Sequence, residues 1–261
     1  MRERPPAVAG FFYPSDPVTL TAQVDGFLDA APGGTPPPAI LVPHAGYIYS
    51  GSTAGLAFSL WRGAPIHHVV IVGPTHRVGI AAIAIPDADA MATPLGSVPI
   101  WQEGVDIALQ QSPVVVSAEV HEQEHSLEVQ LPFLQRALDS FDVLPLAAGW
   151  VTPEAVAQVL EALWATPDLG VVISSDLSHY HRYDQAQVID QATIAQVLAL
   201  DATIDHDQAC GATGLNAMVL LAASHHLKPR LLGACNSGDT AGDKRRVVGY
   251  AAVAFERGDQ S

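Results

Sequence analysis

The stretch AILVPHAGYIYSGSTAGLAFSLW, residues 39–61, decides the fold. Its first four residues, 39–42, form an apolar run that predicts a short buried strand, and the small residues from 50 to 61 predict a closely packed helix. Between them His44 stands in a turn that contains Gly46. A strand, a tight turn and a helix in this order are the repeating unit of α/β domains. His44 at such a turn has two interpretations, a polar cap on the strand or a ligand on a rigid edge.

The same alternation continues to the end of the chain. We predict one α/β domain over residues 1–261, with a mostly parallel or mixed central sheet flanked by helices, an irregular N-terminal arm at 1–17 and a flexible tail at 257–261. Besides 39–42, the predicted strands are residues 67–73, 81–85, 113–120, 141–149, 169–175, 229–235 and 247–255. Besides 50–61, the predicted helices are residues 19–31, 105–111, 127–138, 153–164, 184–200 and 211–226.

Composition excludes several classes of function. The 261 residues carry 12 Lys and Arg against 27 Asp and Glu, a net charge of −15, which disfavours nucleic acid and anionic membranes as partners. The longest apolar stretch, 215–223, is much shorter than the roughly 20 residues of a membrane span. The N-terminal sequence MRERPPAVAGFF has no apolar core of a signal peptide, and two cysteines do not make a disulfide framework. We therefore expect a cytoplasmic protein.

Polar residues follow three of the predicted strands. His44 follows the first strand, His76 follows the strand at 67–73, and Asp176 and His179 follow the strand at 169–175. In parallel sheets such positions meet at one edge, so we expect them to converge. Neutral imidazoles there would form a transition-metal site, completed by a carboxylate or a thiolate. Cys210 precedes a predicted helix, whose dipole would favour its thiolate. The alternative is that each histidine is an ordinary loop residue or strand cap.

The segment HEQEH, residues 121–125, matches the H-E-x-x-H pattern of zinc proteases. That pattern requires both histidines on one helix. Pro132 instead places the helix start near Glu128, after both histidines, so we do not expect a protease. His125 and Glu128 remain candidates for proton transfer or for supporting the site.

Five motifs in order, VAGFFYP, PHAGYIYSG, GPTH, EHSLEVQLPF and SSDLSHY, resemble the Memo family, including its bacterial and archaeal members called AmmeMemoRadiSam system protein B. The resemblance runs from about residue 6 to 255. It implies a fold similar to LigB-type class III extradiol dioxygenases, and a metal triad of His44, His76 and Cys210. Phe12 stands where the animal proteins carry a tryptophan linked to peptide binding, and the segment after Cys210 lacks the family's histidine–proline pair.

These observations lead to one expected function and two rivals. We expect a mononuclear redox protein, dioxygenase-like but without activity towards catechols, that uses Fe²⁺ or copper, or less favourably zinc, on an unidentified small molecule. His179 would act as acid or base, and Asp176 would orient it or a ligand. The first rival is a binding module without turnover, which acts with the radical-SAM system partner proteins that the family name implies. The second is a zinc-dependent hydrolase.

Overall fold

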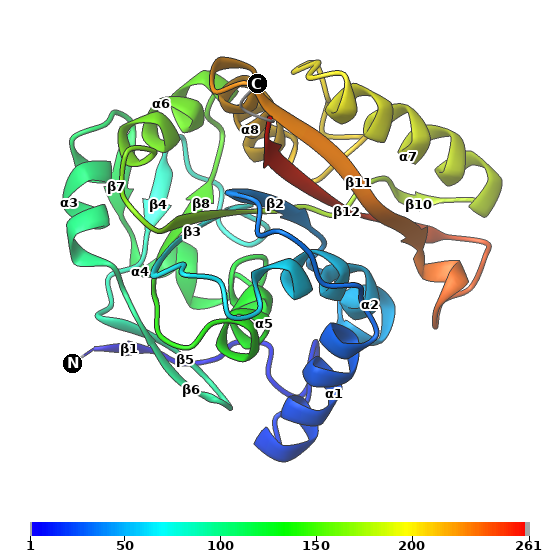
Figure 1. Cartoon of the computed structure of the whole chain (residues 1–261), viewed down its shortest axis with the longest axis horizontal. Helices are drawn as coiled ribbons and strands as arrows, with labels where there is room; N and C mark the ends of the chain where they lie inside the picture. The colour runs from blue at the N-terminus through cyan, green and yellow to red at the C-terminus, as the bar shows by residue number, and fades with distance from the viewer. Residues whose placement is uncertain (1, 259–261) are drawn as a thin grey trace.

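A nine-stranded mixed sheet runs through the middle of the computed structural model, which describes residues 2–258 (Figure 1). Its strands are β2 (Ala39–Val42), β3 (His68–Pro74), β4 (Ile83–Ile85), β7 (Val114–Val116), β8 (Asp142–Ala148), β9 (Leu169–Ser174), β10 (His179–His181), β11 (Leu227–Asn236) and β12 (Val247–Arg257). The spatial order is β10-β12-β2-β9-β3-β8-β4-β7, and β11 pairs with β12. The expected α/β class with a mixed sheet is confirmed.

The centre of the sheet is parallel, and its register fixes where the strand ends lie. Strands β2, β9, β3 and β8 are parallel neighbours whose interior residues are buried, as expected for strands covered on both faces. Leu41 of β2 and Val72 of β3 both lie opposite Ile173 of β9. Strands β2, β9 and β3 therefore end at the same level of the sheet, so the residues that follow them lie close together.

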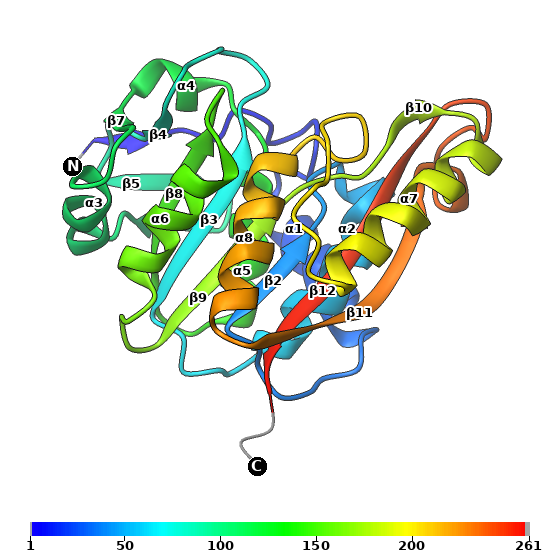
Figure 2. The same cartoon turned by 90° about the horizontal axis from the view of Figure 1, so that it is seen from above.

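Helices cover both faces of this sheet (Figure 2). Each layer packs on its own apolar core, and the two cores meet the sheet from opposite sides. One layer is made by α3 (Gln102–Leu109), α6 (Pro153–Leu163), α7 (Tyr183–Leu198) and α8 (Ala212–Ser224). The other is made by α1 (Pro17–Asp29), α2 (Tyr47–Phe58) with the 3₁₀ helix η1 (Ser59–Trp61), and α5 (Leu131–Ala137). None of the helices within residues 2–258 is long and apolar enough to cross a membrane.

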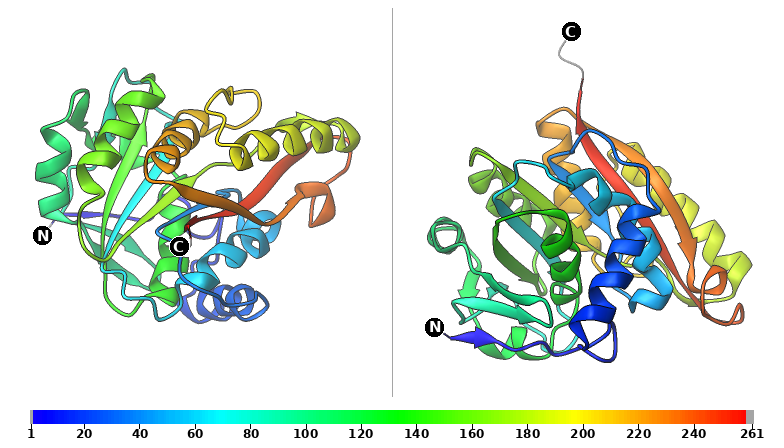
Figure 3. Two further views of the ribbon diagram at one scale, coloured as in Figure 1. Left: turned by 45° about the horizontal axis from the view of Figure 1, so that its top comes forward. Right: turned by 60° about the horizontal axis from the view of Figure 1, so that its bottom comes forward.

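Strands β11 and β12 form a long twisted ribbon at one end of the sheet, with α7 packed along it (Figure 3). The ribbon continues through the short η3 (Ser237–Asp239) and the loop that leads into β12. The tail expected at 257–261 begins inside β12, at Arg257, and residues 259–261 lie outside the described residues.

Two predicted elements differ from the structure. The strand predicted at 113–120 ends at Val116, because Ser117 accepts a hydrogen bond from the backbone of Val120 and caps a new helix, α4 (Ala118–Glu122). The helix predicted at 127–138 begins as the 3₁₀ turn η2 (Glu128–Gln130) and becomes α-helical at Leu131.

The N-terminal arm is less irregular than expected. Its first residues form β1 (Glu3–Arg4), which pairs with β5 (Ala90–Thr93), and β5 pairs with β6 (Gly96–Pro99) in a separate three-stranded sheet. Two-residue pairing of this kind leaves no periodic pattern in the sequence, so it was not predictable from apolar spacing.

Candidate metal centre

Three neighbouring strands deliver the polar residues expected at the edge of the sheet. His44 follows β2, Asp176 follows β9 and His76 follows β3, each three or four residues beyond the aligned positions described above. The backbone amides of His44 and Ala45 donate to Oδ1 of Asp176, at 2.8 and 3.3 Å. The turns after β2 and β9 are thus tied together, which fixes where the His44 side chain leaves the chain.

The hydrogen bonds around His44 determine which ring nitrogen faces the site. Its Nδ1 lies 2.9 Å from Oγ of Ser174, whose own hydroxyl hydrogen is donated to the carbonyl of Ser126 at 2.6 Å. Ser174 therefore accepts from His44, and Nδ1 carries the proton. The lone pair is then on Nε2, the nitrogen that points into the site. His44 is 2% exposed, and burial lowers its pKa well below the usual range, so the ring stays neutral.

A buried carboxylate, that of Glu124, determines which ring nitrogen of His76 faces the site. Oε1 of Glu124 lies 2.9 Å from Nδ1 of His76, and the backbone amides of His76, His125 and Ser126 also donate to this carboxylate. Burial alone would raise the pKa of Glu124, but these hydrogen bonds outweigh it and lower the pKa to about 2. Glu124 is therefore an ionised acceptor, which leaves the lone pair of His76 on Nε2.

His125 is the third imidazole of the group. Its ring centroid lies 4.5 Å from that of His76 and 5.4 Å from that of His44, while Phe12 contacts its other side at 4.7 Å. One ligand atom from each of His44, His76 and His125 lies within 4.8 Å of the others. Burial lowers the pKa of His125 to about 4, so this ring is also neutral near pH 7. The sequence predicts His125 as a proton-transfer or supporting residue, and the structure brings its ring beside those of His44 and His76 as a third nitrogen donor.

Cys210 lies beside this group but on one side of it. Its Sγ is 3.2 Å from Nε2 of His44 and 3.7 Å from the carbonyl oxygen of Asp176. Burial, assisted by the negative charge of Asp176, raises the pKa of the thiol to about 12. The thiolate preference expected from the nearby helix start is therefore wrong for the metal-free chain. A bound cation would reverse that balance, because thiolates are the form that binds metals.

The remaining candidates separate into two places. Asp176 and His179 line the cavity beside the histidines, and burial raises the pKa of Asp176 to about 7 and lowers that of His179. Glu128 does not line this cavity. It is completely buried and accepts hydrogen bonds from Arg4, from Tyr13 and from the backbone amides of Ala7 and Val8. Glu128 therefore anchors the N-terminal arm, and its expected place at the catalytic site is not supported.

The zinc-protease pattern at 121–125 is not on one helix. His121 lies in the last turn of α4, and its Nε2 donates to the carbonyl oxygen of Ala84 at 2.8 Å. It is not among the residues that line the cavity. His125 follows in the loop after α4. Glu124, which lies between the two histidines and orients His76, is not among the residues predicted from the sequence, although its position inside HEQEH was the available signal.

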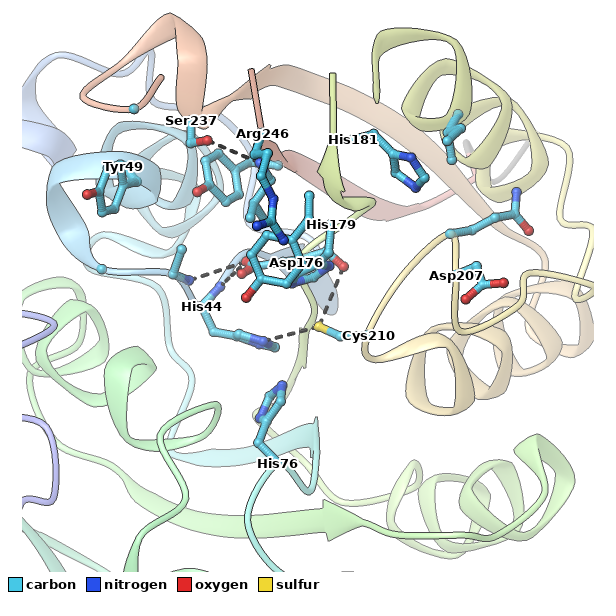
Figure 4. Close-up of a pocket in the computed structure, with 18 of the residues that line it drawn as sticks. His44, Tyr49, His76, Asp176, His179, His181, Asp207, Cys210, Ser237 and Arg246 are labelled. Carbon is cyan, nitrogen blue, oxygen red and sulfur yellow. Dashed lines mark hydrogen bonds between the residues drawn. The ribbon is translucent and has the colours of Figure 1, made fainter. Parts of the chain in front are cut away.

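The histidines open into a cavity of about 1090 Å³ (Figure 4). We call the side formed by His44, His76 and His125 the imidazole wall. The opposite side, the β10 wall, is formed by Tyr180 and His181 of β10 with Ser237 and Arg246 from the β11–β12 connection. Figure 4 shows His44, His76 and Cys210 directed towards a common space, with Arg246 entering from the other side.

The donor set fits a transition metal. Two imidazoles present Nε2 lone pairs whose direction is fixed by buried acceptors, and a third imidazole and a thiol lie next to them. Nitrogen and sulfur donors of this kind suit iron, copper or zinc rather than magnesium or calcium.

Comparison with known proteins places the chain among related sequences. The profile described as Memo-like protein matches residues 4–254. A MEMO1 family protein of Metallosphaera sedula is 35% identical over 280 aligned positions, covering 97% of this chain and 99% of the relative. One from Aquifex aeolicus is 36% identical, covering 98% and 100%. The crystal structure of an uncharacterized Escherichia coli K12 protein superposes with a TM-score of 0.50 over 83% of this chain and 98% of that one, at 12% identity, which shows likeness of fold.

Proposed function

This chain belongs to the Memo-like protein family, and on that premise we propose that it is a mononuclear metal-binding protein with redox activity. His44 and His76 would hold the ion, with His125 as the third imidazole and Cys210 as an additional or alternative ligand. The observation that carries the proposal is the fixed tautomer of His44 and His76. Two lone pairs aimed into one cavity by Ser174 and Glu124 are what a metal site requires and what a strand cap does not.

Iron is the metal that we propose, with copper and zinc as alternatives. Bound at these residues, Fe²⁺ would supply one-electron chemistry at positions open to the cavity. The exposed fraction rises from 2% for His44 to 13% for the His125 side chain and 28% for that of His76. The group is therefore closed towards the protein core and open towards the cavity, where a small molecule can approach it.

Two neighbouring residues would handle protons. His179 lines the cavity, and burial lowers its pKa, so its ring is neutral near pH 7 and one ring nitrogen carries a free lone pair. Asp176 is held by two backbone amides and lies at the cavity surface between the strand ends. His179 would accept or return a proton at that free nitrogen, while Asp176 keeps the β2 and β9 turns in place.

Two other functions remain candidates. The protein could carry metal or bind a partner of a radical-SAM system without turnover, or it could be a hydrolase that uses zinc at the same residues. The fixed lone pairs of His44 and His76 are compatible with the redox protein, the binding module and the hydrolase. The identity of the bound metal and the presence of turnover distinguish these three functions.

The test is elemental analysis of anaerobically purified protein, followed by affinity measurements for Fe²⁺, Cu⁺ and Zn²⁺. We expect one iron per chain and an affinity that falls by more than about 100-fold in His44→Ala and His76→Ala, since even residues that only orient a ligand contribute roughly 10–100-fold. Comparing His125→Ala with Cys210→Ala identifies the third ligand.

A matched pair of variants separates the orientation of His76 from a general loss of negative charge. Glu124→Gln should weaken metal affinity by about 10–100-fold, whereas Glu122→Gln, which removes an exposed carboxylate two residues away, should leave it unchanged. Absence of binding by any of these metals would contradict the proposal, and preferential zinc binding with hydrolytic activity would replace it with the hydrolase.

A further inference from the structure

The β10 wall contains a cation that the protein itself does not neutralise. No carboxylate lies within ion-pair distance of Arg246 anywhere in residues 2–258, although the chain has a net charge of −15. Figure 4 shows its guanidinium directed into the cavity, on the side of Asp176 and His179. Arg246 is exposed, and its guanidinium is available to bind an anion that enters the cavity.

The neighbouring charges leave Arg246 free. Asp243 lines the same cavity, but it is engaged by Arg245, with an Nε–Oδ2 distance of 2.7 Å. Lys244 lies over the ring of Tyr183, 4.3 Å from its centroid. Lys244 and Arg245 therefore each have a partner within the loop or on α7. Of the three consecutive basic residues of this loop, Arg246 is the one that lines the cavity.

The ring of Tyr180 contacts the guanidinium of Arg246. The guanidinium carbon lies 5.0 Å from the centroid of the Tyr180 ring, within the range of a cation–π contact. Tyr180 has a φ of 62°, and the pairing of β10 with β12 is irregular at this residue. A left-handed tyrosine is an unfavourable conformation that surrounding structure must impose, and such residues cluster at ligand sites.

We propose that the β10 wall is an anion subsite in which Arg246 binds the carboxylate or phosphate group of the substrate. This inference rests on the proposed function only in taking the cavity as the substrate site. The guanidinium offers a planar fork of N–H donors that matches either anion. Asp205 and Asp207 also line the cavity, and Figure 4 shows Asp207 on the α8 side, away from Arg246. Their negative charges would repel the anionic end of a substrate towards Arg246.

The test measures binding of benzoate, phenyl phosphate and neutral benzamide to metal-free protein by ligand-observed NMR. In the wild type we expect benzoate or phenyl phosphate to bind more tightly than benzamide. Arg246→Gln should raise the Kd of the preferred anion by roughly 10–100-fold and leave that of benzamide unchanged, and Arg246→Lys should recover part of the loss. Which anion is preferred identifies the group as carboxylate or phosphate.

Arg182→Gln is the matched control, because it removes the same charge from an exposed residue that is not among the cavity lining. Equal losses in Arg182→Gln and Arg246→Gln, or an unchanged Kd in Arg246→Gln, would overturn the proposal. Metal affinity of the same variants is measured separately. Arg246-dependent anion binding without metal binding would overturn the metal proposal alone, and metal binding without it would overturn the anion subsite alone.

Discussion

The imidazole wall and the β10 wall face the same cavity but are built in opposite ways. On the imidazole wall, His44 and His76 are each held by a buried acceptor, Ser174 or Glu124. On the β10 wall, Tyr180 is 64% exposed, and its ring and the guanidinium of Arg246 contact each other rather than buried polar groups. One wall is fixed before a ligand arrives, whereas the other retains side-chain freedom.

The difference assigns a separate task to each wall. Groups that must meet within a fraction of an ångström need rigid support, and the imidazole wall has it. Groups that only recognise part of a substrate can adjust, at a cost in ordering entropy. We therefore expect substitutions behind the imidazole wall to cost stability, and those on the β10 wall to cost little.

The largest expected effect is that of Glu128→Gln, behind the imidazole wall. Glu128 is fully buried and paired with Arg4, and removing one partner of a buried ion pair costs about 3–5 kcal/mol. Urea denaturation measures the free energy of unfolding. Glu122→Gln, on the exposed side of α4, should change it by less than about 0.5 kcal/mol. Similar small values for both variants would show that the imidazole wall does not depend on the arm.

The second prediction concerns pH. Burial lowers the pKa of His121 to about 4, against about 6.5 in the unfolded chain, so the unfolded state binds a proton first. Stability from this group is complete above pH 6.5 and falls as the pH drops towards 4, by up to about 3 kcal/mol.

The measurement for this second prediction is the free energy of unfolding at several pH values between 7 and 4.5. His121→Gln keeps an amide donor for the carbonyl of Ala84 and should make the slope less steep, while His125, whose pKa burial also lowers to about 4, continues to contribute. Glu124 does not contribute in this window, because a carboxyl with a pKa of about 2 loses its stabilising effect only below pH 4.5. A slope that is unchanged in His121→Gln would show that His121 does not contribute to it.

The smallest expected effect is that of Tyr180→Gly, on the β10 wall. Glycine relieves the left-handed conformation but adds freedom to the unfolded chain, so the unfolding free energy should change by less than about 1 kcal/mol. Loss of the contact with Arg246 should weaken benzoate or phenyl phosphate binding by roughly 2–5-fold. A destabilisation above about 2 kcal/mol would remove the contrast between the two walls.

The sequence was sufficient for the residues that follow strands. His44, His76 and Asp176 were predictable as neighbours because apolar runs mark β2, β3 and β9, and parallel strands end at one edge. The charge state of Cys210 was not predictable, since it depends on burial that the helix start does not reveal.

The direction in which individual charged side chains point could not be predicted from the sequence. Glu124 and Glu128 are both acidic residues in HEQEHSLE, yet one orients His76 and the other anchors the N-terminal arm, and only the path of the loop decides which. Likewise Lys244, Arg245 and Arg246 form a single basic run, and only the fold shows which of them enters the cavity.

The anchoring of the N-terminal arm by Glu128 also has a consequence for biosynthesis. Arg4 is translated before its partner Glu128, which follows 124 residues later. At about 5–20 residues per second, the arm waits roughly 6–25 s for its anchor. During that time Phe12 has no His125 to contact, so the cavity acquires this part of its lining only after both segments have been translated. Cys210 is translated later still, so the site is complete only after residue 210 has been made.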